Sequence, residues 1–226
     1  MRERSRRVSP PLLAPEDDPE VYPDAWRTTE GSPLRARVDW DAIFGRHAPL
    51  ALEIGTGNGA FMLAESGQHP ETNFVGIERS REFFLKFKKL MVREGRTNVR
   101  CVCADAEEVL PPLFENSSLE TVICLFSDPW PKRRHRDRRV FRTDFMEEIE
   151  RVVRPGGTLR FKTDVGWYFN LTVHLVRRRA QWKMLDAGPC LENNPEGDSG
   201  SHPPTNFERK ARIVGREIWG FVAVRT

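Results

Sequence analysis

Three glycines at alternate positions, directly after a short apolar run, constrain this chain more than any other feature. The run covers Pro49–Ile54, the glycines are Gly55, Gly57 and Gly59, and a helix-compatible segment, Ala60–Glu65, follows. Glycine is required where the backbone turns with a positive φ, or where a ligand must approach closer than a Cβ atom allows. The amides that open the following helix point at whatever lies above the turn. The pattern therefore predicts a strand, a tight turn and a helix.

A second short apolar run, Phe74–Glu78, ends in an acid about 20 residues after the glycines. Nucleotide-binding βαβ units place a carboxylate at this spacing, where it accepts hydrogen bonds from ribose hydroxyls. The glycines alone are also compatible with an ordinary glycine-rich turn. Together with Glu78, they favour an adenosine-bearing cofactor.

The composition is typical of one globular domain. The chain has 226 residues, of which 38% are hydrophobic and 31% charged, enough for a core without disulfides or metal ions. No apolar run approaches the roughly 18 residues that a membrane helix needs, and the basic start is not followed by the apolar stretch of a signal peptide. The four cysteines form no CxxC pair. We therefore expect a cytoplasmic protein with no membrane partner and no metal.

Alternating periodicities along the chain predict an α/β fold with a Rossmann-like, doubly wound, mostly parallel sheet and an antiparallel strand near the C-terminus. Residues 1–32, rich in Pro, Arg and acids, are expected to form a mobile arm, and residues 33–226 a single domain. The expected strands are 50–54, 73–78, 98–104, 119–126, 158–163 and a closing strand within 213–224. The expected helices are a single turn at 39–45 and longer helices at 58–67, 80–95, 141–152 and 165–180. A short helix is expected to begin at Asp105 and end before Pro111-Pro112. Loops are expected at 127–138 and 188–204.

Acidic residues lie at or just after the ends of the predicted strands. They are Glu53, Glu78, Asp105, Asp128 and Asp164. In such sheets ligands bind outside the carboxyl ends of the strands. Acids around a glycine loop suit a positively charged cofactor better than a dinucleotide, and S-adenosyl-L-methionine carries both a sulfonium and an amino group.

Each part of that cofactor has a candidate partner. Glu78 is assigned to the ribose, Asp105 with its neighbour Ala106 to the adenine, and Glu53 to the methionine end. Gly55, Gly57 and Gly59 would allow close approach of the backbone. A helix N-cap or a solvated surface charge is the alternative interpretation for each acid.

The segment after the fourth predicted strand combines an acid, an aromatic residue and a basic cluster. Asp128 is followed by Pro129-Trp130-Pro131, and basic residues crowd the segment Lys132–Arg139. A carboxylate can bind the ring N–H groups of a base, and arginines can bind phosphates. Lys132, Arg134 and His135 are thus candidate phosphate contacts, His135 also being compatible with a structural role, and a solvated charge run is the alternative.

At this point the chain resembles the bacterial tRNA (guanine-N7-)-methyltransferase family of class I S-adenosylmethionine-dependent methyltransferases. The resemblance runs from about Phe44 to the C-terminus. Its motifs are Leu52–Gly59, Gly76–Glu78, Asp128–Lys132 with Arg134-His135, Lys162–Asp164 and Thr205-Asn206-Phe207-Glu208. The segments before Trp40 and from Leu191 to Ser201 depart from the family pattern.

The resemblance implies a role for each matching position. Glu53, Glu78, Asp105 and Asp128 correspond to cofactor-binding acids, and Asp128 is also the candidate catalytic residue. Lys132, Asp164 and Thr205–Glu208, including Asn206 and Phe207, correspond to contacts with the tRNA substrate. The implied reaction is methylation of N7 of the guanine at position 46, in the variable loop of tRNA.

Three other functions stay open at this stage. A class I methyltransferase with a protein or small-molecule acceptor would keep the glycine loop and Glu78. It would leave the basic loop, Lys132–Arg139, unexplained. A non-catalytic RNA-binding protein could use the same fold. A dehydrogenase is disfavoured by the acids around the glycine loop.

Overall fold

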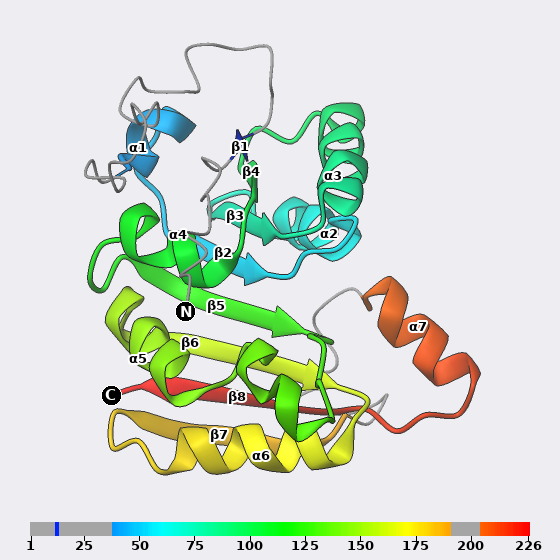
Figure 1. Ribbon diagram of the computed structural model, residues 1–226. Helices are drawn as coiled ribbons and strands as arrows, with labels where there is room; N and C mark the ends of the chain where they lie inside the picture. The colour runs from blue at the N-terminus through cyan, green and yellow to red at the C-terminus, as the bar shows by residue number, and fades with distance from the viewer. Residues whose placement is uncertain (1–11, 14–37, 191–203) are drawn as a thin grey trace, which may run out of the picture.

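The computed structural model describes residues 12–13, 38–190 and 204–226, in which strands and helices alternate (Figure 1). The strands are β1 (Leu12–Leu13), β2 (Leu50–Ile54), β3 (Asn73–Glu78), β4 (Val99–Cys103), β5 (Leu119–Leu125), β6 (Val153–Thr163), β7 (Trp182–Pro189) and β8 (Trp219–Arg225). The helices are α1 (Trp40–Phe44), α2 (Ala60–Gln68), α3 (Arg81–Glu94), α4 (Ala106–Leu113), α5 (Thr143–Val152), α6 (Gly166–Arg177), α7 (Asn206–Ile213) and the 3₁₀ helix η2 (Arg133–Arg138).

The strands form one eight-stranded sheet in the order β1-β4-β3-β2-β5-β6-β8-β7. The five strands from β4 to β6 run parallel, whereas β8 is antiparallel to both β6 and β7. The expected doubly wound, mostly parallel sheet with an antiparallel strand near the C-terminus is confirmed. Of the expected N-terminal arm, only Leu12–Leu13 is described, paired with Val102 and Cys103; the rest lies outside the described residues.

Both faces of the sheet are covered, which explains the continuous apolar runs of its central strands. In β2, Leu50, Leu52 and Ile54 pack into one core, which also contains residues of α4, α5 and α6. Ala51, between them, points to the other face and packs with residues of α2 and α3. Because side chains alternate along a strand, Glu53 lies on the same face as Ala51, under α2.

Helix ends follow the capping residues in the sequence. Ser80 accepts a hydrogen bond from the amide of Phe83 at the start of α3, and Gly95 ends that helix at φ 61°. Asp39 and Gly45 bound the expected turn α1 in the same way. Phe84 and Phe87, on one side of α3, are buried in the core, whereas Phe83 is exposed.

Two sequence predictions fail for identifiable reasons. Helix α4 continues through Pro111 and Pro112 instead of ending before them. The prolines lie in its last turn, and the buried side chains of Val109, Leu110 and Leu113 stabilise that turn more than two missing N–H donors weaken it. The expected loop at 127–138 is 3₁₀-helical from Arg133 onward.

Besides the two-residue strand β1, two elements were not expected at all. Strand β7 is an edge strand that pairs only with β8, and several of its side chains are exposed, so it lacks an apolar alternation. Helix α7 buries only Glu208 and Ala211, so its sequence carries no apolar stripe. Strand β6 also starts earlier than expected, because Pro155–Gly157 continues the strand beyond an irregular register opposite β5.

The carboxylate of Glu150 joins α5 to the segment after α6, and it provides a stability test. It accepts hydrogen bonds from Arg179 Nη1 at 2.6 Å and from the buried Trp182 Nε1 at 3.1 Å. Glu150→Gln should lower the free energy of unfolding by about 2 kcal/mol, because the largely buried guanidinium of Arg179 loses the nearer of its two carboxylate partners and keeps Glu147, at 3.6 Å. The measurement is urea unfolding followed by circular dichroism.

The matched control is Glu82→Gln, which breaks the exposed helix pair of Glu82 with Lys86. Exposed pairs contribute little to stability, so this variant should unfold at nearly the urea concentration of the wild type. Equal losses in the two variants would contradict a structural role for Glu150.

Candidate active site

The carboxyl ends of the parallel strands meet at one edge of the sheet, shown by the arrowheads of β2, β3, β5 and β6 in Figure 1. Because the spatial order is β4-β3-β2-β5-β6, the predicted acids occur along this edge in the order Asp105, Glu78, Glu53, Asp128, Asp164. The order reverses between β2 and β5, the position where open α/β sheets bind ligands. The topology therefore brings the predicted site residues to one edge.

The glycine loop connects β2 to α2 through three left-handed residues. Gly55, Gly57 and Gly59 have φ values of 78°, 56° and 74°. A Cβ atom at Gly59 would lie 2.0 Å from the ring of Phe87, whereas one at Gly55 or Gly57 would meet nothing within 4 Å. Gly59 is therefore required by close packing on α3, while Gly55 and Gly57 leave open space over the turn.

Glu78 fixes the shape of this loop. Its Oε2 accepts a hydrogen bond from the amide of Gly57 at 2.8 Å, and its Oε1 accepts one from the amide of Ser80 at 2.7 Å. Each carboxylate oxygen can accept more than one hydrogen bond. Glu78 can thus hold the loop and still accept hydrogen bonds from ribose hydroxyls.

Glu53 is buried beside the loop, and its charge is poorly compensated. Its side-chain oxygen Oε2 has no hydrogen-bond partner among the described residues. Burial first, and then the neighbouring charges of Glu65 and Glu78, raise the pKa of Glu53 to about 8. The hydroxyl of Thr56, in the same turn, is also buried without a partner in the described structure. A positive charge beside Glu53 would stabilise its ionised form. The raised pKa of Glu53 and the unsatisfied oxygens of Glu53 and Thr56 therefore fit a cationic ligand.

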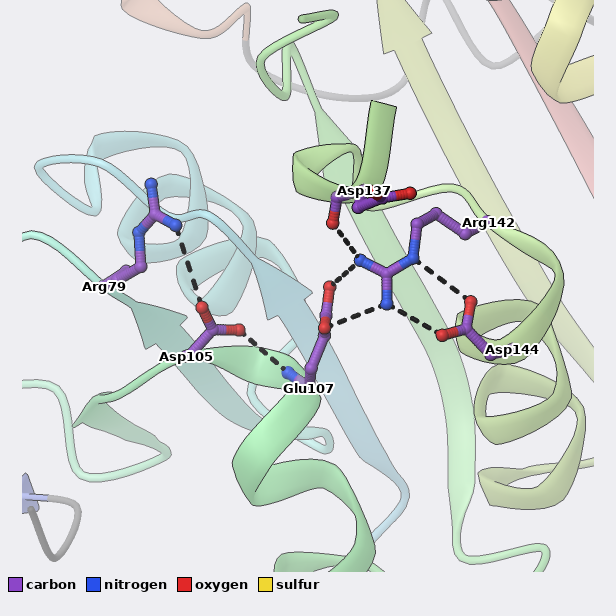
Figure 2. A network of polar contacts seen from close by, with 6 residues as sticks. All are labelled: Arg79, Asp105, Glu107, Asp137, Arg142 and Asp144. Atoms are coloured by element: carbon purple, nitrogen blue, oxygen red, sulfur yellow. Dashed lines mark hydrogen bonds and ion pairs between the residues drawn. The ribbon is translucent and has the colours of Figure 1, made fainter. Parts of the chain in front are cut away.

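Asp105, at the β4 end of the acidic row, is the N-cap of α4, and Figure 2 shows its contacts with Glu107 and Arg79. Its Oδ1 accepts a hydrogen bond from the amide of Glu107 at 3.1 Å, and Arg79 Nη1 lies 3.7 Å from its Oδ2. The helix-cap interpretation is therefore correct for Asp105. The side chain is 38% exposed, so the carboxylate is accessible to a ligand as well, and Ala106 follows it as the first residue of α4.

Asp128 lies on the other side of the glycine loop, between two residues with strained backbones. It is exposed and has no hydrogen bond or ion pair with the described residues. Phe126 and Trp130 have φ values of 55° and 42°, a conformation that costs about 1–3 kcal/mol in a residue other than glycine. Arg139 compensates, since its guanidinium donates hydrogen bonds to the carbonyls of Pro129 and Trp130. Sequence reasoning assigned no such role to Arg139, because nothing local indicates it.

The basic loop leaves its cations accessible but covers its aromatic ring. Lys132 and Arg134 are exposed. The guanidinium of Arg138 lies 4.9 Å from the centre of the Trp130 ring, and His135 packs edge-on against the same ring. Trp130 therefore does not present an open aromatic face to a base, and His135 makes a structural contact.

Helix α7 lies beside the arrowheads of β5 and β6 (Figure 1), attached by charged side chains. Thr205 caps the helix by accepting a hydrogen bond from the amide of Glu208. The buried Glu208 pairs with Arg212 at 2.8 Å and lies 3.8 Å from Lys162 Nζ, also buried. Asp164 pairs with Arg216 at 2.6 Å. Thr205, Glu208 and Asp164 thus all have structural partners, which the sequence motifs did not indicate.

Phe207 is the aromatic residue of α7 that faces outward. Its side chain is 54% exposed, and its ring centre lies 5.6 Å from that of Phe126. Phe126 is two residues before Asp128, so α7 packs against the segment that carries the exposed carboxylate. Its neighbour Asn206 is exposed as well.

Three observations limit the chemistry of the described part of the chain. No group of His, Cys, Asp and Glu residues in it could hold a metal ion. None of its helices has the length and apolar character needed to cross a membrane. The cysteines at positions 101, 103, 124 and 190 form no disulfide with one another.

The sheet order and the acid-lined glycine loop define a class I S-adenosylmethionine-dependent methyltransferase. The 16S rRNA methyltransferase KamB has a similar structure, with a TM-score of 0.59 at 13% identity over 83% of this chain and 93% of that one. A precorrin-6y C5,15-methyltransferase from Geobacter metallireducens superposes with a TM-score of 0.54 at 12% identity, over 79% of this chain and 81% of the other. At such low identity these likenesses show the fold alone.

Sequence comparison identifies the family. A family model described as "Putative methyltransferase" matches residues 47–221. A tRNA (guanine-N(7)-)-methyltransferase of Rhodopirellula baltica is 35% identical over 89% of this chain and 75% of its own length, and one of Pseudomonas putida is 33% identical over 84% and 80%. One of Thermotoga maritima is 36% identical over 84% of this chain, which spans only 58% of that relative. The chain belongs to the tRNA (guanine-N7-)-methyltransferase family.

The raised pKa of Glu53 predicts a pH-dependent stability. Between pH 4.5 and about 8 the folded chain keeps a proton on Glu53 that the unfolded chain has released. The raised pKa of Glu53 therefore stabilises the folded chain fully below pH 4.5, and this stabilisation is lost as the pH rises through about 8. Glu53→Gln removes this loss, so the variant should be more stable than the wild type above pH 8, with the difference shrinking toward pH 4.5.

Urea unfolding of both proteins across this pH range measures the difference. Parallel stability curves for wild type and variant would mean that Glu53 ionises as freely in the folded chain as in the unfolded one.

Proposed function

We propose that this chain transfers a methyl group from S-adenosylmethionine to N7 of a guanine in tRNA, at position 46 of the variable loop. The observation that carries the proposal is the position of Asp128. This exposed carboxylate lies at the switch point, between the acid-lined glycine loop and a loop rich in exposed cations. The relatives, which are tRNA (guanine-N(7)-)-methyltransferases by name, support tRNA as the substrate.

The acids on one side of Asp128 would bind the cofactor. Glu78 would accept hydrogen bonds from the ribose hydroxyls with the lone pairs that Gly57 and Ser80 leave unused. Asp105, with Ala106 beside it, would bind the adenine amino group. Glu53 would neutralise the cationic methionine end, and the absence of a Cβ atom at Gly55 and Gly57 would leave room for it above the turn.

The residues on the other side would bind the RNA. Lys132 and Arg134 would pair with phosphates, since both are exposed on the basic loop, and His135 would hold Trp130 in place. Phe207, supported by Phe126, offers the open ring on which a base can stack, at about 1–3 kcal/mol for each base. Asp164, Thr205, Asn206 and Glu208 would shape this part of the site by fixing α7 over the sheet edge.

The reaction needs positioning more than proton transfer. Guanine N7 has a lone pair in the plane of the ring and needs no general base. When bound, the cofactor supplies an electrophilic methyl group, whose bond to sulfur breaks with its electron pair as the bond to N7 forms. Asp128 would orient the base through its ring N–H groups and oppose the positive charge that develops on the purine.

Cellular location and domain organisation follow the same proposal. We place the enzyme in the cytoplasm, where tRNA is available and where its cysteines, none of them in a disulfide, would stay reduced. Residues 33–226 would form the catalytic domain, and Leu12–Leu13, from the segment expected to be an arm, pair with β4 of its sheet.

The direct test is methylation of an unmodified tRNA transcript. Incubation with methyl-labelled S-adenosylmethionine, followed by aniline cleavage, should locate 7-methylguanine at position 46. A transcript with adenine at this position is the control and should not be cleaved there. Binding of tRNA without methyl transfer would instead support a non-catalytic RNA-binding protein, and methylation of other acceptors alone would support a different substrate class.

Asp128→Ala should reduce kcat by about 100-fold or more, because the variant loses transition-state charge stabilisation. The affinity for S-adenosylmethionine, measured by calorimetry, should change far less. Asp186→Ala, at an exposed aspartate of β7, is the matched control and should leave both quantities unchanged. Equal losses of turnover and cofactor affinity in Asp128→Ala would make Asp128 a cofactor ligand only.

A further inference from the structure

The guanidinium of Arg142 uses all of its N–H groups within the protein (Figure 2). Nε and Nη2 donate hydrogen bonds to the two carboxylate oxygens of Asp144, at 3.1 and 2.8 Å. Nη1 and Nη2 donate to the two oxygens of Glu107, the latter at 2.9 Å, and Nη1 also donates to the carbonyl of Asp137. These bonds account for the five donors of an arginine side chain. Arg142 therefore has no donor left for an RNA phosphate.

The partners of Arg142 come from three elements that surround the site. Glu107 is in the first turn of α4, and its amide donates a hydrogen bond to Asp105, a candidate adenine ligand. The carbonyl of Asp137 belongs to η2, the 3₁₀ helix of the basic loop. Asp144 is in the first turn of α5. Arg142 thus joins the basic loop to the cofactor-side acids (Glu53, Glu78 and Asp105) through Glu107, whose amide is bonded to Asp105.

The strength of this junction comes from its geometry and partial burial. The side chain of Arg142 is 21% exposed, and its bonds to Asp144 and Glu107 raise its pKa further above the usual range. The hydrogen bonds from Arg142 also lower the pKa of Asp144. Two bidentate carboxylate pairs on one planar guanidinium are more rigid than a single exposed ion pair. A lysine could not replace it, because its ammonium group is a point charge without the planar fork.

We propose that Arg142 is a positioning residue that fixes the basic loop relative to the cofactor-side acids, and so sets the alignment of the bound RNA. The inference rests on the proposed function, because it assumes that Lys132 and Arg134 bind tRNA. Arg142 contacts neither substrate nor cofactor and acts through η2 and α4. Its loss should therefore reduce tRNA recognition while leaving cofactor binding intact.

The test compares the kinetics of Arg142→Gln and Arg142→Lys with those of the wild type. Both variants should raise KM for a tRNA transcript roughly five- to tenfold, the effect of about 1 kcal/mol of lost binding. Their kcat values and affinities for S-adenosylmethionine should stay within about twofold of the wild type. Lysine should not restore KM, although it restores the charge.

Arg154→Gln is the matched control. Arg154 also makes a bidentate pair, with Glu120 at 2.7 Å for both bonds, but it lies near the start of β6, at the opposite edge of the sheet. It should leave KM unchanged.

A double-mutant cycle with Lys132→Ala separates positioning from direct contact. If Arg142 acts through the basic loop, Lys132→Ala should raise KM less in the Arg142→Gln background than in the wild type. Additive effects, an unchanged KM in Arg142→Gln, or rescue by lysine would each overturn the proposal. If Arg142→Gln does not fold, Glu107→Gln breaks the same junction from α4 and should raise KM alike; an unchanged KM there would also overturn it.

The two hypotheses fail separately. A wild-type protein that does not methylate the tRNA transcript would refute the proposed function. An active wild type with Arg142 variants of normal KM would refute only the positioning role.

Discussion

The burial of Glu53 beside two other acids is the physical constraint on which this account depends. A carboxylate in an apolar environment is unfavourable unless it is protonated or paired with a positive charge. Oε2 of Glu53 has no partner in the described structure, and its pKa is raised to about 8. Glu53 therefore keeps its proton at neutral pH unless a positive charge lies beside it, and a cationic cofactor bound at the glycine loop would supply that charge.

The sheet topology converts this local feature into a two-sided site. The strand order reverses between β2 and β5. The cofactor-side acids therefore lie at or just after the ends of β2, β3 and β4, and the basic loop follows β5, the neighbour of β2. Strained backbone at Phe126 and Trp130 positions Asp128 between them, and Arg139 stabilises that strain. A base aligned by the basic loop would thus meet the methyl donor at the point where the two sides join.

Much of the fold could be predicted because the apolar runs, capping residues and glycines are local signals. The positions of Glu53, Glu78 and Asp128, at or just after the ends of strands, follow directly from these local signals. The partners of these residues could not be predicted, because they come from distant segments. Glu208 contacts Lys162, Arg139 supports the turn at Trp130, and α7 lacks an apolar stripe. Periodicity indicates which residues are buried, but not which buried charges pair.

Proton release on cofactor binding tests the central claim most directly. Calorimetric titration of the protein with S-adenosylmethionine, in buffers of different ionisation enthalpy at about pH 6.5, counts the protons exchanged. The account predicts that the wild type releases roughly one proton, since the cation converts Glu53 to its charged form, and that Glu53→Gln releases none. No proton release from the wild type, or the same release from both proteins, would contradict it.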